Sequence, residues 1–165
     1  MKKIFYTILS IYLFAYINAC TGYTPIYSSS KFNFKIEEYS IKGEERLGNL
    51  IYRKLSNISK SNKNNLESQG ISLLIETNKD KKSTVKNSVG KILEYEINLH
   101  TNLIINDFLT EEVMLDQKFN YSVSYKVQDN HSDTIKLENK NIENLIDKTY
   151  QDILIKISEI TSLKW

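Results

Sequence analysis

The chain has 165 residues, with 22 Lys and Arg against 20 Asp and Glu, two His and one Cys. This length predicts one domain that can bury a substantial core, and a hydrophobic fraction of 41% argues against disorder across the whole chain. The formal net charge of +2 excludes a strong basic field that would recruit nucleic acid. A single cysteine excludes an intramolecular disulfide framework and a cysteine-rich metal cluster.

The first 19 residues have the features of a signal peptide. Lys2 and Lys3 form a short basic start, and a mainly apolar run over residues 4–17 follows. This run is shorter than the ~20 residues of a membrane-spanning helix. Without residues 1–19 the chain has 20 basic and 20 acidic side chains, so the remaining domain is neutral.

The only cysteine directly follows this run, and Ile17-Asn18-Ala19-Cys20 resembles the bacterial lipobox. The resemblance implies that residues 1–19 are removed and that Cys20 carries a diacylglycerol and an N-acyl chain. Each buried CH₂ of such an anchor contributes ~0.8 kcal/mol. Thr21 in place of an Asp favours the outer membrane. The alternative is a free cysteine at the end of an uncleaved anchor. Residues 20–31 carry the only proline and predict a tether.

Alternating apolar and polar side chains predict a first strand over residues 32–41. Apolar residues at helical spacing then predict a helix over residues 44–58. Residues 59–70 are rich in Ser, Asn and Lys and predict a loop. Alternation resumes in a strand that starts at Ile71 and is expected to end in the charged stretch at residues 78–82.

The strongest alternation predicts two long strands over residues 93–105 and 115–127, most simply one hairpin. A polar turn at residues 128–133 leads to a helix over residues 140–162. The predicted order is β-α-β-β-β-α. Two amphipathic helices and a sheet with one apolar face must bury each other. We therefore expect an α+β two-layer sandwich, with two helices packed on one face of a four-stranded sheet, in a single domain over residues 32–165.

No catalytic or metal-binding motif is present: there is no Gly-rich phosphate loop, no G-x-S-x-G and no H-E-x-x-H. His100 falls on the polar face of a predicted strand and His131 in a predicted turn, so both are interpreted as surface histidines. Glu94 and Glu96 share one strand face, and paired acids can serve acid/base catalysis, but a solvated sheet face is the favoured interpretation. The sequence thus predicts neither an enzyme nor a metal site, and no cofactor apart from the acyl groups on Cys20.

Five lysines cluster near one end of the predicted sheet: Lys79, Lys81, Lys82, Lys86 and Lys91. In a neutral domain they form a local concentration of positive charge, and lysine can bind phosphate as a point charge. The alternative is an ordinary solvated loop.

The segment Cys20-Thr21-Gly22-Tyr23-Thr24-Pro25-Ile26-Tyr27 resembles the mature start of the LPS-assembly lipoprotein family, LptE, in its alphaproteobacterial form. In that form the lipidated cysteine is followed by Gly, an aromatic residue, a variable residue, Pro, Leu and Tyr. Here Thr21 is an extra residue and Ile26 replaces Leu. The predicted order of elements is also similar to that of the family over nearly the whole chain.

The resemblance implies a non-enzymatic outer-membrane lipoprotein whose partner is the LptD β-barrel. LptE-like proteins plug the lumen of that barrel and assist lipopolysaccharide assembly. It also implies lipopolysaccharide contacts by basic residues, which Lys86 ahead of the long hairpin and Lys136 or Lys140 ahead of the last helix could match. Barrel interiors are polar, and a strand face rich in Asn and Ser is compatible with that environment.

Two other hypotheses stay open at this point. The chain could be a periplasm-facing lipid or lipoprotein carrier, which would require a lipid-sized, apolar-lined cavity inside the domain. It could also be a small envelope hydrolase, although the sequence shows no nucleophile–base pair.

Overall fold

A computed structural model describes residues 34–61 and 68–162 of the chain. It contains β1 (Phe34–Gly43), α2 (Glu45–Ser61), β2 (Gln69–Lys86), β3 (Ile92–Asp107), β4 (Val113–Lys126) and α3 (His131–Ser162). The predicted order β-α-β-β-β-α and the α+β fold class are confirmed. The predicted signal peptide, Cys20 and the tether over residues 20–31 lie outside the described residues.

The strands form one sheet in the order β1-β2-β3-β4. β1 runs parallel to β2, with Phe34 opposite Gln69, and α2 provides the crossover connection that a parallel pair requires. The β2–β3 and β3–β4 pairs are antiparallel. The predicted long hairpin is therefore β3–β4, in which Leu99 lies opposite Tyr121.

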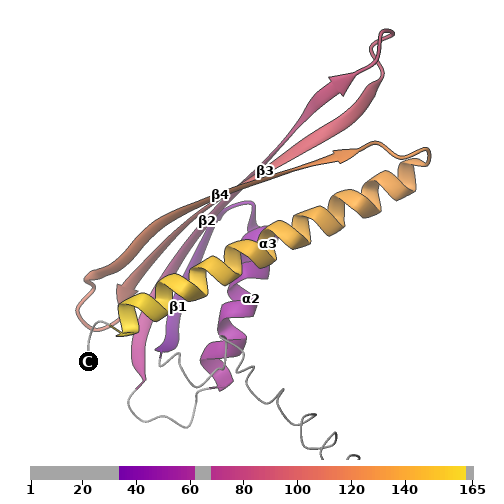
Figure 1. Cartoon of the computed structure of the whole chain (residues 1–165). Helices are drawn as coiled ribbons and strands as arrows, with labels where there is room; N and C mark the ends of the chain where they lie inside the picture. Colours follow the sequence, from indigo (N-terminus) through magenta and orange to yellow (C-terminus); the bar gives the residue numbers. More distant parts are fainter. Residues whose placement is uncertain (1–33, 62–67, 163–165) are drawn as a thin grey trace, which may run out of the picture.

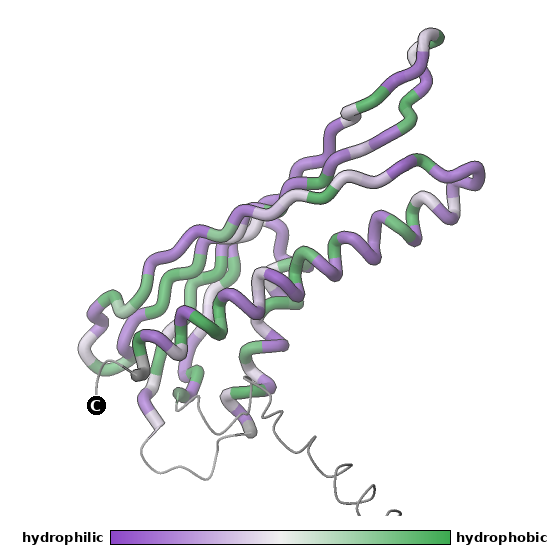
Figure 2. Tube along the Cα trace, viewed as in Figure 1, coloured by the Kyte–Doolittle hydropathy of each residue, from purple (hydrophilic) through white to green (hydrophobic). Residues whose placement is uncertain are grey.

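Both helices pack on the same face of the sheet, with α3 crossing it at a slant (Figure 1). Hydrophobic and hydrophilic residues alternate along the strands (Figure 2), and in β3 every second residue from Ile97 to Ile105 is buried. Fully burying one Leu or Ile side chain contributes ~1.5–3 kcal/mol. The helices supply six side chains that are at most 1% exposed: Leu47, Ile51, Leu55, Ile146, Ile153 and Leu154.

β2 is longer than predicted. The sequence suggested that this strand ends within residues 78–82, but it continues to Lys86. β1 ends at Gly43, opposite Thr77, so the rest of β2 pairs only with β3. The two strands project together beyond the body of the sheet (Figure 1). The charged half of β2 lacks apolar alternation, and the strand is maintained there by the ladder to β3 rather than by burial.

α3 also begins earlier than predicted, at His131 rather than at residue 140. The polar turn expected over residues 128–133 is correspondingly shorter, and His131 is the first helical residue instead of a turn residue. The added turns contact β4 and the turn after it mainly through polar groups, with Leu137 as an apolar contact to the core. Thr134 is buried, and its hydroxyl accepts the Gln128 N–H at 2.9 Å. Contacts of this kind produce no apolar periodicity, which is why the spacing of hydrophobic residues missed them.

Two glycines with similar backbone angles give a matched test of the β1–α2 corner. Gly43 has φ +78°, and a Cβ there would lie 2.1 Å from the Thr77 carbonyl oxygen, whereas Gly90 has φ +83° and open space around it. Gly90→Ala should cost about 1–2 kcal/mol, the strain of a left-handed alanine. Gly43→Ala should cost about 3 kcal/mol, because the backbone must also shift. Urea unfolding measures both, and equal costs would contradict the tight corner.

Candidate functional site

The face of the sheet opposite the helices is mainly polar, with Leu74 and Ile104 as an apolar pair on it, and is not covered by any described helix (Figure 1). Apart from the strand ends beyond the register shifts at residues 83–86 and 105–106, even-numbered residues of β2, β3 and β4 point to this side, because successive side chains of a strand alternate between the two faces. We call this surface the open face. Its polar residues include Ser72, Glu76, Asn78, Asp80, Lys82, Glu94, Glu96, Asn98, His100, Asn102, Asn106, Asp116, Lys118, Asn120, Ser122, Ser124 and Lys126.

Side chains on the open face bond to one another across and along the strands. Glu96 Oε1 lies 3.0 Å from Lys82 Nζ and accepts a hydrogen bond from Asn98 Nδ2 at 3.2 Å. These two bonds hold the pKa of Glu96 below its usual value. His100 Nδ1 lies 2.7 Å from Asn120 Oδ1. The surface thus combines neutral amide and hydroxyl groups with charges of both signs.

Glu94 and Glu96 lie on the same face, as the sequence pattern indicated, but each carboxylate has a structural partner. Glu94 Oε1 accepts a hydrogen bond from the Thr84 hydroxyl at 3.0 Å, and Glu96 pairs with Lys82. Within residues 34–61 and 68–162, no group of three His, Cys, Asp or Glu side chains could hold a metal ion. No helix in this part of the chain has both the length and the apolar character needed to cross a bilayer.

The predicted lysine cluster is mostly neutralised. Three of its five members have carboxylate partners: Lys79 with Glu44 at 3.9 Å, Lys81 with Glu138 at 2.5 Å and Lys82 with Glu96 at 3.0 Å. Among the described residues, Lys86 and Lys91 form no ion pair within 4.0 Å. The uncompensated positive charge of this cluster therefore lies at the tip of the β2–β3 hairpin.

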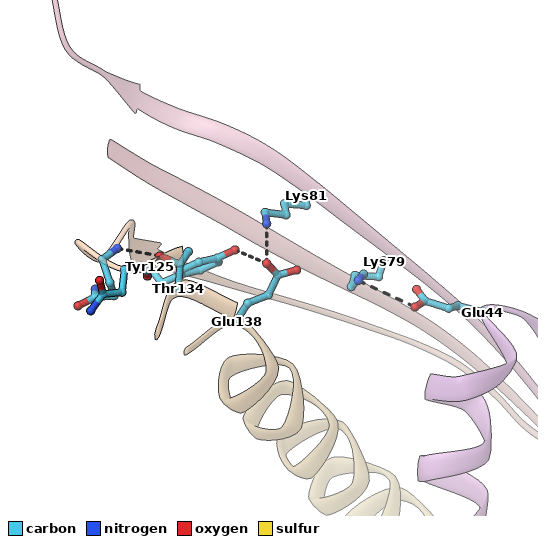
Figure 3. Close-up of polar contacts among 8 residues, drawn as sticks. Glu44, Lys79, Lys81, Tyr125, Thr134 and Glu138 are labelled. Carbon is cyan, nitrogen blue, oxygen red and sulfur yellow. Dashed lines mark hydrogen bonds and ion pairs between the residues drawn. The ribbon is translucent and has the colours of Figure 1, made fainter. Parts of the chain in front are cut away.

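Lys81 connects the projecting hairpin to the start of α3 (Figure 3). Its ammonium lies 2.5 Å from Glu138 Oε2 and 4.2 Å from the centroid of the Tyr95 ring. The Tyr125 hydroxyl donates to the same Glu138 oxygen at 2.8 Å. One ion pair and two aromatic rings thus link all three antiparallel strands to α3 at the end of the hydrophobic core, of which Tyr125 is a member.

The two charges of this pair stabilise each other. Burial raises the pKa of Glu138, but hydrogen bonds from Lys81 and Tyr125 outweigh it, so the pKa lies below its usual value near 4.5. Burial lowers the pKa of Lys81, but Glu138 and Tyr125 raise it above its usual value near 10.5. Both groups therefore remain charged throughout the physiological pH range.

Side chains fill the space between the sheet and the helices, where the core residues are at most 6% exposed. The clefts among the described residues lie elsewhere. One of about 190 Å³ lies between α2 and α3, with Lys54, Glu143 and Asp147 in its lining, and two others lie at the edges of the described chain. One of about 410 Å³ lies between β4 and α3, and one of about 270 Å³ lies beside Lys81. Charged and polar side chains contribute to the lining of each. None of these clefts is the apolar-lined interior cavity that the carrier hypothesis requires.

The three lysines suggested by the family resemblance do not form one site. Lys86 is the last residue of β2, on the projecting hairpin, and Lys136 and Lys140 lie in the first turns of α3. The tip of the hairpin and the start of α3 stand apart in Figure 1. Lys136 Nζ also pairs with Asp133 at 3.4 Å, in an exposed contact. The structure therefore supplies two separate basic positions.

Sequence reasoning missed Glu138 and Tyr125 as partners of Lys81. A signal was present, because Glu138 lies in line with the buried Ile142 and Leu145 on α3. Lys81 likewise continues the odd-numbered positions that are buried earlier in β2. Opposite charges at core-facing positions of two elements indicate a partly buried ion pair.

No protein-family model and no curated protein matches this chain. Several solved structures share its fold. A lipoprotein structure from Caulobacter crescentus CB15 superposes with a TM-score of 0.60 at 15% identity, over 83% of this chain and 96% of that one. A lipoprotein B from Nitrosomonas europaea superposes with a TM-score of 0.60 at 17% identity, over 86% of this chain and 94% of that one. Rare lipoprotein B from Shewanella oneidensis superposes with a TM-score of 0.54 at 13% identity, over 78% of this chain and 99% of that one.

These neighbours define the fold as one found in bacterial lipoproteins. At this level of identity the likeness concerns the fold alone, and it agrees with the independent lipobox pattern that ends at Cys20.

The Lys81–Glu138 pair predicts a pH-dependent stability. Glu138→Gln should lower the free energy of unfolding at neutral pH by about 1–2 kcal/mol, because Lys81 loses its charged partner. The folded-state pKa of Glu138 is depressed, so its contribution is present above the usual value near 4.5 and is lost as the pH falls through the folded-state pKa. The difference between parent and variant should therefore shrink on acidification, as measured by urea unfolding.

Asp133→Asn provides the control, since it removes the exposed pair with Lys136 on the same helix. It should cost at most about 0.5 kcal/mol. A Glu138→Gln effect that stays constant down to acid pH, or that equals the Asp133→Asn effect, would contradict the coupling.

Proposed function

We propose that the chain is an outer-membrane lipoprotein of the LptE type, anchored through an acylated Cys20. In this proposal it occupies the lumen of an LptD-like β-barrel, as a partner and plug, and assists lipopolysaccharide assembly at the outer membrane. The observation that carries the proposal is the open face, a polar sheet surface left uncovered by both helices. Neighbours of the same fold that are named as lipoproteins, including rare lipoprotein B, support it.

The dimensions of the open face suit contact with a barrel wall. β3 has 16 residues, which span ~50 Å at 3.3 Å per residue. The apolar band of an outer-membrane barrel is only ~25 Å tall, so such a strand could follow the wall across the whole membrane. Barrel interiors are polar and wet, and the amides and hydroxyls of Asn98, Asn120 and Ser122 could bond to such a wall directly or through water.

The charge distribution is consistent with a binding role rather than a catalytic one. Glu94 and Glu96 on the open face contact Thr84 and Lys82 respectively. In this proposal the chain performs no chemical step. Lipopolysaccharide phosphates would meet the free lysines at two places, Lys86 on the hairpin and Lys140 on α3. Lys136 is the weaker candidate, because Asp133 already shares its charge.

Cys20→Ala tests the anchor. The substitution removes the only sulfur that can accept a diacylglycerol. We therefore expect loss of acyl labelling, a precursor-sized band on gels and loss of the mature membrane-anchored form. A barrel partner should still co-purify with the soluble domain that lacks the anchor. Unchanged mobility and membrane anchoring in Cys20→Ala would contradict the lipoprotein assignment.

Asn98→Arg tests the open face. Asn98 lies in the middle of β3, and a long charged side chain there would stand between the sheet and the wall. Co-purification with the LptD-like barrel should fall about tenfold, as expected when a contact near the centre of an interface is lost. Asn144→Arg is the matched control, because Asn144 is exposed on α3, the element that covers the other face. Equal barrel recovery for both variants would argue against this surface.

A further inference from the structure

β4 is an edge strand, with β3 as its partner in the described chain. Just past β4, the Val127 N–H donates to the Leu93 carbonyl at 2.9 Å, one step beyond the Glu94–Lys126 pair. In an antiparallel ladder the hydrogen-bonded pairs recur at every second residue, so the odd-numbered residues of β4 bond to β3. The backbone N–H and C=O groups of the even-numbered residues point away from the sheet.

The free part of this edge has defined ends. The Lys118 carbonyl accepts the Gln117 side-chain amide at 3.2 Å, and the Lys126 carbonyl accepts that of Gln128 at 3.0 Å. Between them, Asn120, Ser122 and Ser124 are exposed, and β3 is the only strand registered against β4 in the described chain. At these three alternate residues the backbone N–H and C=O groups point away from the sheet, and an added strand can pair with them.

A cleft of about 410 Å³ lies beside this edge on the helix side of the sheet. Its lining includes Phe119 and Tyr121 of β4 and Ile155 of α3, which is 42% exposed. In a strand added to β4, the residue opposite Tyr121 would point to the helix side, because side chains of paired residues share one face. An apolar side chain at that position would cover Ile155.

The charges at the edge select the occupant. Lys118 and Lys126 flank the free segment on the open face, and neither forms an ion pair with a described residue. On the helix side, Lys148 Nζ lies 4.4 Å from the centroid of the Tyr121 ring, but the Tyr121 hydroxyl donates to the Asp152 carboxylate, so both signs of charge are present there. The positive charge that selects a carboxylate is therefore that of Lys118 and Lys126 on the open face. A second copy of the chain, paired antiparallel about Ser122, would place Lys118 against Lys126, which is unfavourable.

The chain's own N-terminal segment is also a poor match, since residues 1–33 contain no Asp or Glu. The chemistry of the edge favours carboxylates spaced to meet both lysines.

We propose that the edge of β4 from Lys118 to Lys126 is a docking site for an extended acidic segment of a partner protein. The segment adds as a fifth strand, with carboxylates opposite the two lysines and an apolar side chain over the cleft at Ile155. The site uses the backbone edge of β4, and its even-numbered side chains, among them Lys118, Ser122 and Lys126, also belong to the open face. Binding of the acidic segment to this edge does not require a barrel partner.

A synthetic nine-residue peptide tests the site. It carries Glu at both ends, apolar residues at its even positions and a fluorescent label, and its binding to the full chain in detergent is followed by anisotropy. We expect saturable binding of this peptide and at least about tenfold weaker binding of the same peptide with Lys at both ends. Ser122→Pro should weaken binding at least about tenfold, because it removes an outward N–H.

Ser122→Pro should leave the fold intact, since proline is tolerated where a strand's N–H faces solvent. Its thermal unfolding should match that of the parent, whereas Val123→Pro, which loses a ladder bond to β3, should unfold at a lower temperature. If Ser122→Pro fails to fold, the Lys118→Glu, Lys126→Glu double variant carries the test, and it should prefer the peptide that ends in Lys.

Four results would overturn the proposal. They are equal binding of the two peptides, binding that neither variant changes, peptide binding only after deletion of residues 20–33, and a dimer in solution that Ser122→Pro dissociates. The third result would make the chain's own tether the occupant, and the fourth would make it a second copy of the chain.

Discussion

Burial on one side of β3 is the constraint on which the rest of the structure depends. Alternate residues from Ile97 to Ile105 are buried against the helices, and the residues between them remain on the open face. Because the side-chain period of a strand is two, a slip of one residue would turn Asn98 and His100 into the core. β2 and β4, which pair with β3 on its two sides, must turn their apolar side chains to the same face of the sheet. A well-packed core and an uncovered polar face are thus two results of one register.

Beyond this core the order of the molecule depends on polar contacts. Lys81 and Glu138 are partly buried, so part of their Coulomb attraction is offset by desolvation. The Tyr95 and Tyr125 rings next to the Lys81 ammonium compensate in part. The main result of this arrangement is geometric. It fixes where the first turns of α3 lie against the hairpin, in a region where few apolar side chains could specify one arrangement.

The layers and the β3–β4 hairpin followed from the sequence because apolar periodicity reports which side of an element is buried. The full length of β2 did not, since its charged half is a strand only through its pairing with β3. The neutralised lysines were equally hidden, because Lys81 finds its carboxylate 57 residues away. The free edge of β4 depends on strand order, and strand order is a property of the assembled sheet that no local pattern encodes. The signal peptide and Cys20 stay predictions.

The parallel pairing of β1 also has a kinetic consequence. β2, β3 and β4 are joined by short turns, so their ladders close small loops, whereas β1 meets β2 only after the whole α2 crossover is in place. Larger loops cost more entropy to close and slow folding. We therefore expect β1 to be the last strand to join the sheet. Until it does, β2 exposes its own unpaired edge, so the first strand of the described chain is the one that shields the nascent domain from aggregation.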